Sequence, residues 1–138
     1  MHAYIRMLMV GFTGVWMACG SPAGTPQAEN QQLGQAKISW QDTLADLGTI
    51  KEGADVTYTF TFKNTGNADL QIQQVIPSCG CTVADVPSVP VHPGQQGHIV
   101  IHYHSAGQTG EQTKQITIVS NALPAKQSLY LKARIIQP

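Results

Sequence analysis

The residues from Val56 to Lys63 (VTYTFTFK) alternate without exception between apolar side chains and threonine or lysine. Successive side chains of a β-strand point to opposite faces, so this segment has one apolar face and one polar face. The alternation predicts a half-buried strand. The residues predicted to point inward are Val56, Tyr58, Phe60 and Phe62, and those predicted to point outward are Thr57, Thr59, Thr61 and Lys63.

The same period of two recurs in short segments along the chain, and residues typical of turns separate these segments. No segment after residue 18 shows the apolar stripe of an amphipathic helix. About seven short strands over roughly a hundred residues predict an all-β fold, an immunoglobulin-like β-sandwich. The predicted strands cover residues 38–40, 44–50, 56–62, 70–75, 98–104, 114–120 and 128–136.

The connections between these strands carry signals of their own. Residues 64–67 (NTGN) are predicted to form a turn, because Asn and Gly tolerate positive φ. Pro77 is predicted to end a strand, since proline removes a donor from the ladder. Pro93-Gly94 predicts a further turn, and residues 105–113 predict a loop too long for a tight hairpin.

The N-terminal segment differs in composition from the rest. Residues 1–6 carry a basic start, and residues 7–18 form an unbroken run of apolar or small residues. A helix of about a dozen residues spans roughly 18 Å, short of the roughly 30 Å hydrocarbon core, which predicts a signal peptide. Ala18 directly before Cys19 resembles the cleavage site of a bacterial lipoprotein, so we predict that acyl chains such as palmitate modify Cys19. Ordinary secretion is the alternative interpretation.

These features divide the chain into three predicted parts: a lipoprotein signal peptide over residues 1–18, a lipidated N-terminus and flexible linker over residues 19–36, and the immunoglobulin-like domain over residues 37–138. The linker prediction rests on Gly, Ser, Pro, Ala and Gln without aromatic residues or an apolar period. The predicted location is the bacterial cell envelope, with the domain lipid-anchored and facing the periplasm.

Charge and motifs exclude several classes of function. Eight Lys and Arg residues balance eight Asp and Glu residues, and their scattered positions provide no electrostatic reason to bind nucleic acid. The sequence contains no nucleophile elbow, no zinc-protease helix motif, no phosphate loop and no paired carboxylates. We therefore predict no enzyme activity and no cofactor.

Cys79 and Cys81 flank a single glycine in the segment PSCGCTV (residues 77–83), and lipidation of Cys19 would leave these two as a pair. In an extended strand their Cα atoms would lie about 6.6–6.8 Å apart, at the outer limit for a disulfide, although Gly80 allows a kink. Four interpretations stay open: a local disulfide, two reduced cysteines packed as small apolar residues, a copper or zinc site, and a thiol–disulfide redox couple.

Histidines form the second candidate cluster. In the predicted strand HIVIHYH, Ile99, Ile101 and Tyr103 point inward, and His98, Val100, His102 and His104 point outward. The spacing of His102 and His104 occurs in zinc and copper sites, and these two with Cys79 and Cys81 form the metal-site alternative. Solvated surface histidines are the other interpretation, and His92 is predicted to be exposed in a proline-rich loop.

An ordered set of short motifs extends over nearly all of residues 38–136. The motifs are Gly48, Lys51-Glu52-Gly53, Phe60-x-Phe62-x-Asn64-Thr65-Gly66, Leu70-x-Ile72, Ser78-Cys79-Gly80-Cys81-Thr82, Pro93-Gly94 and Ser120-Asn121. By these motifs the chain resembles a bacterial family of exported domains of unknown function whose hallmark is the SCGCT pentapeptide. That family resembles the wider group of immunoglobulin-like domains called ASH or MSP-like. The resemblance implies a sandwich fold, an envelope location, often a lipid anchor, and no established enzymatic activity.

Together these features predict a lipid-anchored, non-catalytic binding or structural module, with the membrane and an unidentified envelope protein as its partners. Its binding surface is predicted at a sheet edge, first at the last strand (128–136), where Lys132 and Arg134 would guard the edge. The alternative is an envelope protein that binds copper or zinc, or a thiol redox protein, that uses Cys79 and Cys81.

Overall fold

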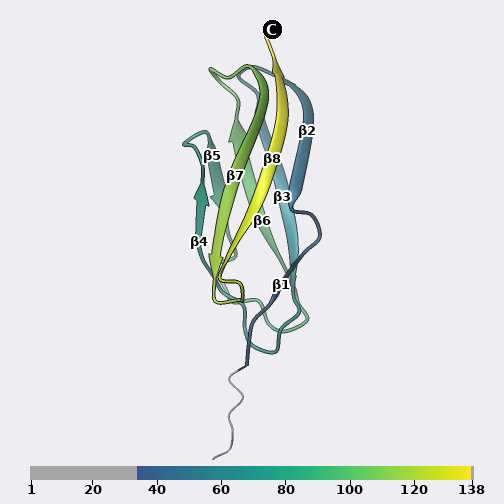
Figure 1. Ribbon diagram of the computed structural model, residues 1–138, viewed down its shortest axis with the longest axis vertical. Coiled ribbons are helices and arrows are strands. Elements are labelled where there is room, and N and C mark those ends of the chain that lie inside the picture. The colour runs from purple at the N-terminus through teal and green to yellow at the C-terminus, as the bar shows by residue number, and fades with distance from the viewer. Residues whose placement is uncertain (1–33, 138) are drawn as a thin grey trace, which may run out of the picture. The chain divides into compact units, whose positions relative to one another are not determined.

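The computed structural model describes residues 34–137, which form eight strands in two four-stranded sheets (Figure 1). These strands confirm the predicted all-β sandwich. In this part of the chain, no helix has the length and apolar character needed to cross a membrane. The strands are β1 (Ile38–Trp40), β2 (Leu44–Lys51), β3 (Asp55–Asn64), β4 (Ile72–Pro77), β5 (Thr82–Asp85), β6 (Gln96–His104), β7 (Gly110–Ser120) and β8 (Lys126–Ile136).

The first sheet has the strand order β1-β3-β6-β5 and is antiparallel throughout. β3 pairs along the whole of β6, whereas β5 pairs only with residues 100–103 of that strand. β5, one of the two outer strands of this sheet, therefore covers only the second half of β6.

The second sheet has the order β2-β8-β7-β4, with β8 parallel to β2 and antiparallel to β7. Figure 1 shows β8, in yellow, between these two strands. The prediction that residues 128–136 form an edge strand is therefore wrong. Lys132 and Arg134 are exposed because they point to the outer face of the sheet, not because they guard its edge.

The core lies between the two sheets and is formed by the inward-facing residues of both. In β3 and β6, the aromatic and branched residues that the alternation places inward are buried or half-buried, which confirms the predicted faces. On the outer face of β3, Thr57 and Thr59 are exposed and Thr61 is half-buried. The largest fully buried side chains are Tyr103, Phe60, Phe62, Leu70, Ile99, Ile101, Ile116, Ile118, Leu129 and Leu131.

Two connections differ from the sequence prediction. β5 was not predicted, because four residues between Cys81 and Pro87 are too few to show a clear period of two. The loop expected over residues 105–113 is shorter, since β7 already begins at Gly110, opposite Ile135 of β8. This connection passes from one sheet to the other, which explains why β6 and β7 do not form a hairpin.

Packing against the sandwich includes the two residues before residue 37. Ala36 is 2% exposed and belongs to the core, and the Gln35 N–H donates to Asn67 Oδ1 at 2.6 Å. β3 extends to Asn64, the first residue of the turn predicted at residues 64–67, and the chain bends at residues 66–68. A Cβ on Gly66 would overlap the Gln35 carbonyl oxygen, so this bend needs glycine for close packing. The predicted signal peptide and Cys19 lie outside the described residues.

Candidate functional site

The two halves of β6 differ in what lies beside them. Successive residues of an antiparallel strand direct their N–H and C=O groups alternately to the strands on either side. The His104 N–H donates to the Cys81 carbonyl on the β5 side at 2.9 Å, whereas the Gln95 carbonyl accepts from the Asn64 N–H on the β3 side at 2.9 Å. The even-numbered residues of β6 therefore point their backbone groups toward the β5 side.

Because the ladder with β5 ends at Val100, the N–H and C=O groups of Gln96 and His98 have no strand beside them. Within residues 34–137, neither the backbone nor the side chains provide these groups with a hydrogen-bond partner. Pro87 is the physical cause, since it would lie opposite His98 if β5 continued in register, and proline has no N–H to donate. We call residues 96–99 the open half of β6 and residues 100–104 its closed half.

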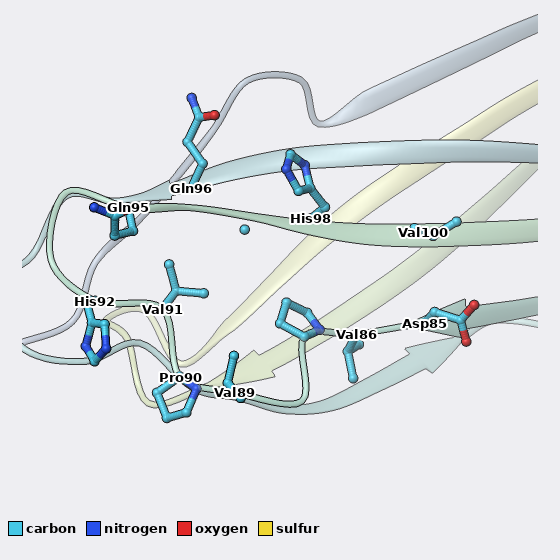
Figure 2. A pocket seen from close by; sticks show the side chains of 12 residues that line it. Asp85, Val86, Val89, Pro90, Val91, His92, Gln95, Gln96, His98 and Val100 are labelled. Atoms are coloured by element: carbon cyan, nitrogen blue, oxygen red, sulfur yellow. The ribbon is translucent and has the colours of Figure 1, made fainter.

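A cleft of about 430 Å³ lies beside the open half (Figure 2). The segment that follows β5 lies opposite this half and lines the cleft with Val86, Val89 and Val91. Val89 is 68% exposed, although valine is among the residues most often buried in proteins. Ligand sites typically have volumes of about 300–1,000 Å³, an apolar lining and a few polar groups, and the cleft fits this description.

Asn64 holds the segment opposite the open half in place. Its side chain is fully buried, and its Nδ2 donates to the carbonyl oxygens of Ala68 at 2.7 Å and Val91 at 2.8 Å. Its Oδ1 accepts from the N–H groups of Gly66 at 3.0 Å and Lys37 at 3.4 Å. One buried amide therefore joins three separate stretches of chain next to the cleft.

A tight turn joins this segment to the open half. The Gln95 N–H donates to the His92 carbonyl at 3.0 Å, and Gly94 has a φ of 80° after Pro93. Proline followed by glycine with positive φ is typical of a type II turn, which confirms the turn predicted at Pro93-Gly94. The His92 side chain is 72% exposed, as predicted, and its Nδ1 lies 2.7 Å from Asp69 Oδ1.

The closed half carries two histidine–aspartate pairs on its outer face. His102 Nε2 lies 3.0 Å from Asp85 Oδ2 of β5, and His104 Nδ1 contacts Asp55 Oδ1 of β3. Both imidazoles are about half exposed, so each pair contributes little to the free energy of folding. The predicted outward orientation of His98, His102 and His104 is confirmed.

The Cys79–Cys81 pair lies in the turn that joins β4 of one sheet to β5 of the other. The two sulfur atoms are bonded, and the Cα atoms are 5.3 Å apart. This separation is shorter than the roughly 6.6–6.8 Å expected for an extended strand, because the chain reverses direction here. Thr82 Oγ1 lies 3.7 Å from Cys79 Sγ and 3.9 Å from Cys81 Sγ, and both cysteines are half-buried.

A hollow of about 200 Å³ beside the closed half is lined by Cys81, His102 and His104, among others. Among residues 34–137, no group of three or more His, Cys, Asp or Glu side chains is arranged to hold a metal ion. The sulfur of Cys81 is bonded to Cys79, and each histidine faces a carboxylate. The structure therefore brings members of the metal-site alternative to one hollow without forming a ligand set.

Tyr103 lies beneath the closed half on the core side. Its side chain is 1% exposed, and its hydroxyl donates a hydrogen bond to Gln108 Oε1 at 2.9 Å. Burial raises the pKa of Tyr103 above its ordinary value of 10.0, because the phenolate would lose its hydration. The hydroxyl therefore stays neutral and acts as a structural donor.

The cleft is the feature that the sequence analysis missed. Its signal is the segment VPSVP (residues 86–90), where valines stand between prolines without any period of two. Prolines exclude a regular strand, so the valines of such a segment have no strand partner to cover them. Exposed valines in a proline-rich segment are thus a readable indication of an apolar surface.

Comparison with protein families gives one match. The family described as "Protein of unknown function (DUF1573)" matches residues 38–135, which include nearly all of the eight strands. No curated protein matches the sequence.

Solved structures share this fold at low sequence identity. A protein of unknown function from Porphyromonas gingivalis W83 is 17% identical, with a TM-score of 0.64 over 72% of this chain and 47% of that chain. The ASH/PapD-like domain 7 of human CEP192 is 11% identical, with a TM-score of 0.57 over 99% of both chains. The VesB protease of Vibrio cholerae is 14% identical, with a TM-score of 0.56 over 72% of this chain and 31% of the protease.

These similarities show the fold alone. The chain spans about half the length of the Porphyromonas protein and about a third of the protease. A shared fold does not imply a shared activity, since function depends on the residues of a site.

Proposed function

The chain belongs to the DUF1573 family, and on this premise we propose that it is a non-catalytic binding module of the bacterial cell envelope, lipid-anchored at Cys19 and facing the periplasm. The binding role is supported chiefly by the cleft of about 430 Å³ beside the open half of β6. Exposed valines and unpaired backbone groups meet there, and both are covered when a partner binds.

The non-catalytic part of the proposal is supported by the residues around the cleft. Its titratable lining residues are Asp85, His92 and His98. His98 Nδ1 lies 3.2 Å from Thr61 Oγ1, and Asp85 and His92 are each engaged with another side chain. Within residues 34–137, Thr61 does not line the cleft, and no serine, threonine, cysteine or lysine does so, whereas these are the side chains that usually act as nucleophiles beside a base.

The lipid anchor is supported by Ala18 before Cys19 and is tested by metabolic labelling. Cells that produce the full chain are supplied with a palmitate analogue, and labelled protein is followed in the membrane fraction. We expect label on the wild type and none on the Cys19→Ala variant, which should leave the membrane fraction. Equal labelling of both proteins would contradict the anchor.

The binding role is tested by site-specific photo-crosslinking of the full chain in its native membrane. Crosslinkers replace three exposed residues on different faces, one in each variant: Val89 at the cleft, Val83 on β5 and Tyr130 on β8. We expect at least one position to capture a partner of defined mass at a high yield. Uniformly low yields from all three positions would contradict a binding module.

A thiol redox or metal-binding protein is the second candidate function. It is favoured by the hollow that Cys81 shares with His102 and His104. A partner dithiol could reduce the Cys79–Cys81 bond with two electrons and two protons, becoming a disulfide itself. Thiol counts and metal content of the purified protein, with and without reductant, distinguish the candidates. Stoichiometric copper or zinc that a Cys79→Ser variant loses would favour the second.

A further inference from the structure

The geometry points to the open half of β6 as the docking site for an extended segment of a partner protein, which adds to the sheet as a strand beside Gln96 and His98. This inference rests on the proposed binding function and names the site and the chemistry of its occupant. The occupant is an uncharged peptide stretch of about four residues in extended conformation, with apolar side chains at alternate positions.

Backbone hydrogen bonding specifies an extended peptide. Gln96 and His98 present two N–H and two C=O groups in a row on the same side of β6, spaced by about 6.6–6.8 Å. A strand that continues the line of β5 would exchange hydrogen bonds with both residues, as β5 does along the closed half. An acyl chain or a flat apolar ligand could not satisfy these groups.

The lining of the cleft specifies the side chains of the added strand. Its alternate residues would face the segment that carries Val89 and Val91, and the residues between them would lie beside the exposed side chains of Gln96 and His98. Burial of apolar area contributes about 25 cal/mol per Å², so valine-sized residues at the inward positions favour binding.

Charge at the cleft favours an uncharged segment. The carboxylate of Asp85 stands where β5 ends, paired with His102 at 3.0 Å, and His92 is paired with Asp69 at 2.7 Å. Within residues 34–137, no lysine or arginine lines the cleft. An acidic side chain buried there would therefore lack a cationic partner, and an unpaired buried charge is costly.

The first test titrates two peptides into the purified full chain in detergent micelles. The probe is a capped nonapeptide with valine at alternate positions and a lysine at each end. The control peptide has the same sequence, but the two amides that would face Gln96 and His98 are N-methylated. We expect saturable binding of the probe, at least tenfold weaker binding of the control, and slower hydrogen exchange at the His98 amide.

Matched protein variants connect the binding to the cleft. Val89 lines the cleft and is 68% exposed, whereas Val83 lies outside it and is 60% exposed, so neither aspartate variant should unfold the domain. We expect Val89→Asp to weaken probe binding at least tenfold and Val83→Asp to change it less than twofold. Thermal unfolding of both variants checks that the fold is kept.

Five outcomes would overturn the inference, four in the binding experiments and one in the photo-crosslinking. The first is the absence of saturable probe binding, and the second is equal affinity for both peptides, which would indicate a general apolar surface such as an acyl-chain site. The third is equal loss of binding in both valine variants. The fourth is a concentration-dependent dimer that Val89→Asp abolishes, which would assign the edge to a second copy. A partner captured only at Tyr130 by photo-crosslinking would also reject this docking site while leaving the proposed binding function intact.

Discussion

The two halves of β6 are consecutive stretches of one strand, yet different interactions hold them in place. The closed half has a backbone ladder on both sides, to β3 and to β5. The open half has a ladder only to β3. The segment across the cleft from it has only an isolated bridge, two backbone hydrogen bonds between Val91 and Leu70, and is also held by the buried amide of Asn64.

This difference has a consequence for mutations. Backbone hydrogen bonds form with almost any residue, so substitutions on the outer face of the closed half should cost little free energy. Buried side chains with several partners cannot be replaced so freely, because each lost partner leaves a desolvated polar group behind. We therefore expect substitutions in and around the open half to lower the free energy of unfolding more than substitutions on the outer face of the closed half.

The largest effect is expected for Asn64→Ala. The variant removes the side-chain partner of the Ala68 carbonyl oxygen and of the Gly66 and Lys37 N–H groups, whereas the Val91 carbonyl keeps its hydrogen bond from the Leu70 N–H. An unsatisfied buried polar group costs about 1–3 kcal/mol. We expect the free energy of unfolding, measured with urea, to fall by about 3 kcal/mol. The control is Asn121→Ala, an exposed asparagine with two hydrogen bonds, which should cost less than about 1 kcal/mol. Equal losses of unfolding free energy in the two variants would contradict the expectation that burial makes the hydrogen bonds of Asn64 more important than those of Asn121.

The next effect is expected for Gly97→Ala in the open half. A Cβ at this position would lie 2.4–3.0 Å from three atoms of the Phe62 ring, and Phe62 is only 1% exposed. Overpacking of a core typically costs about 1–3 kcal/mol, so we expect a loss of about 2 kcal/mol. The matched control is Gly80→Ala in the turn beside the closed half, where no atom lies within 4 Å of the added Cβ. A loss at residue 80 as large as that at residue 97 would contradict the comparison.

The contrast between the halves also shows which structural features can be predicted from the sequence. The inward and outward faces of β3 and β6 followed from the alternation of residues, because a strand's period of two is a local property. The turn at Pro93-Gly94 was predicted for the same reason. Strand order is not local, so residues 128–136 were wrongly expected at an edge although β8 lies inside its sheet.

The cleft and Asn64 depend on residues that are distant in sequence. Asn64 is the last residue of β3, where the sequence predicted the start of a turn, and its hydrogen bonds to Val91 and Lys37 each join residues 27 positions apart. The open half exists because β5 ends opposite Val100 and Pro87, which would lie opposite His98, cannot continue the ladder; β5 itself was too short to be predicted. The register that places Pro87 opposite His98 leaves no periodic pattern in the sequence, so it could not be predicted.

A smaller effect is expected when both cysteines beside the closed half are replaced. A bond between Cys79 and Cys81 closes a loop of three residues, and the chain-entropy estimate for such a loop is about 1.6 kcal/mol. We expect the Cys79→Ser/Cys81→Ser double variant, compared with the oxidised wild type in urea unfolding, to lose no more than this amount. A loss of unfolding free energy above about 3 kcal/mol would show that the disulfide in this turn stabilises the fold strongly. The closed half would then not depend on its backbone hydrogen bonds to β3 and β5 alone.

The smallest effect near neutral pH is expected for Tyr103→Phe, which removes one hydrogen bond to Gln108, worth about 1 kcal/mol. Because burial raises the pKa of Tyr103 in the folded state, the unfolded chain ionises first as the pH rises through about 10. The stability that the neutral phenol contributes is fully present below pH 10 and is lost as the pH rises through the folded pKa. The free energy of unfolding of the wild type should therefore fall more steeply above pH 10 than that of Tyr103→Phe, and urea titrations at pH 8 and pH 11 measure the difference. Parallel curves would mean that Tyr103 ionises equally in both states, and that the core beneath the closed half is wetter than its 1% exposure indicates.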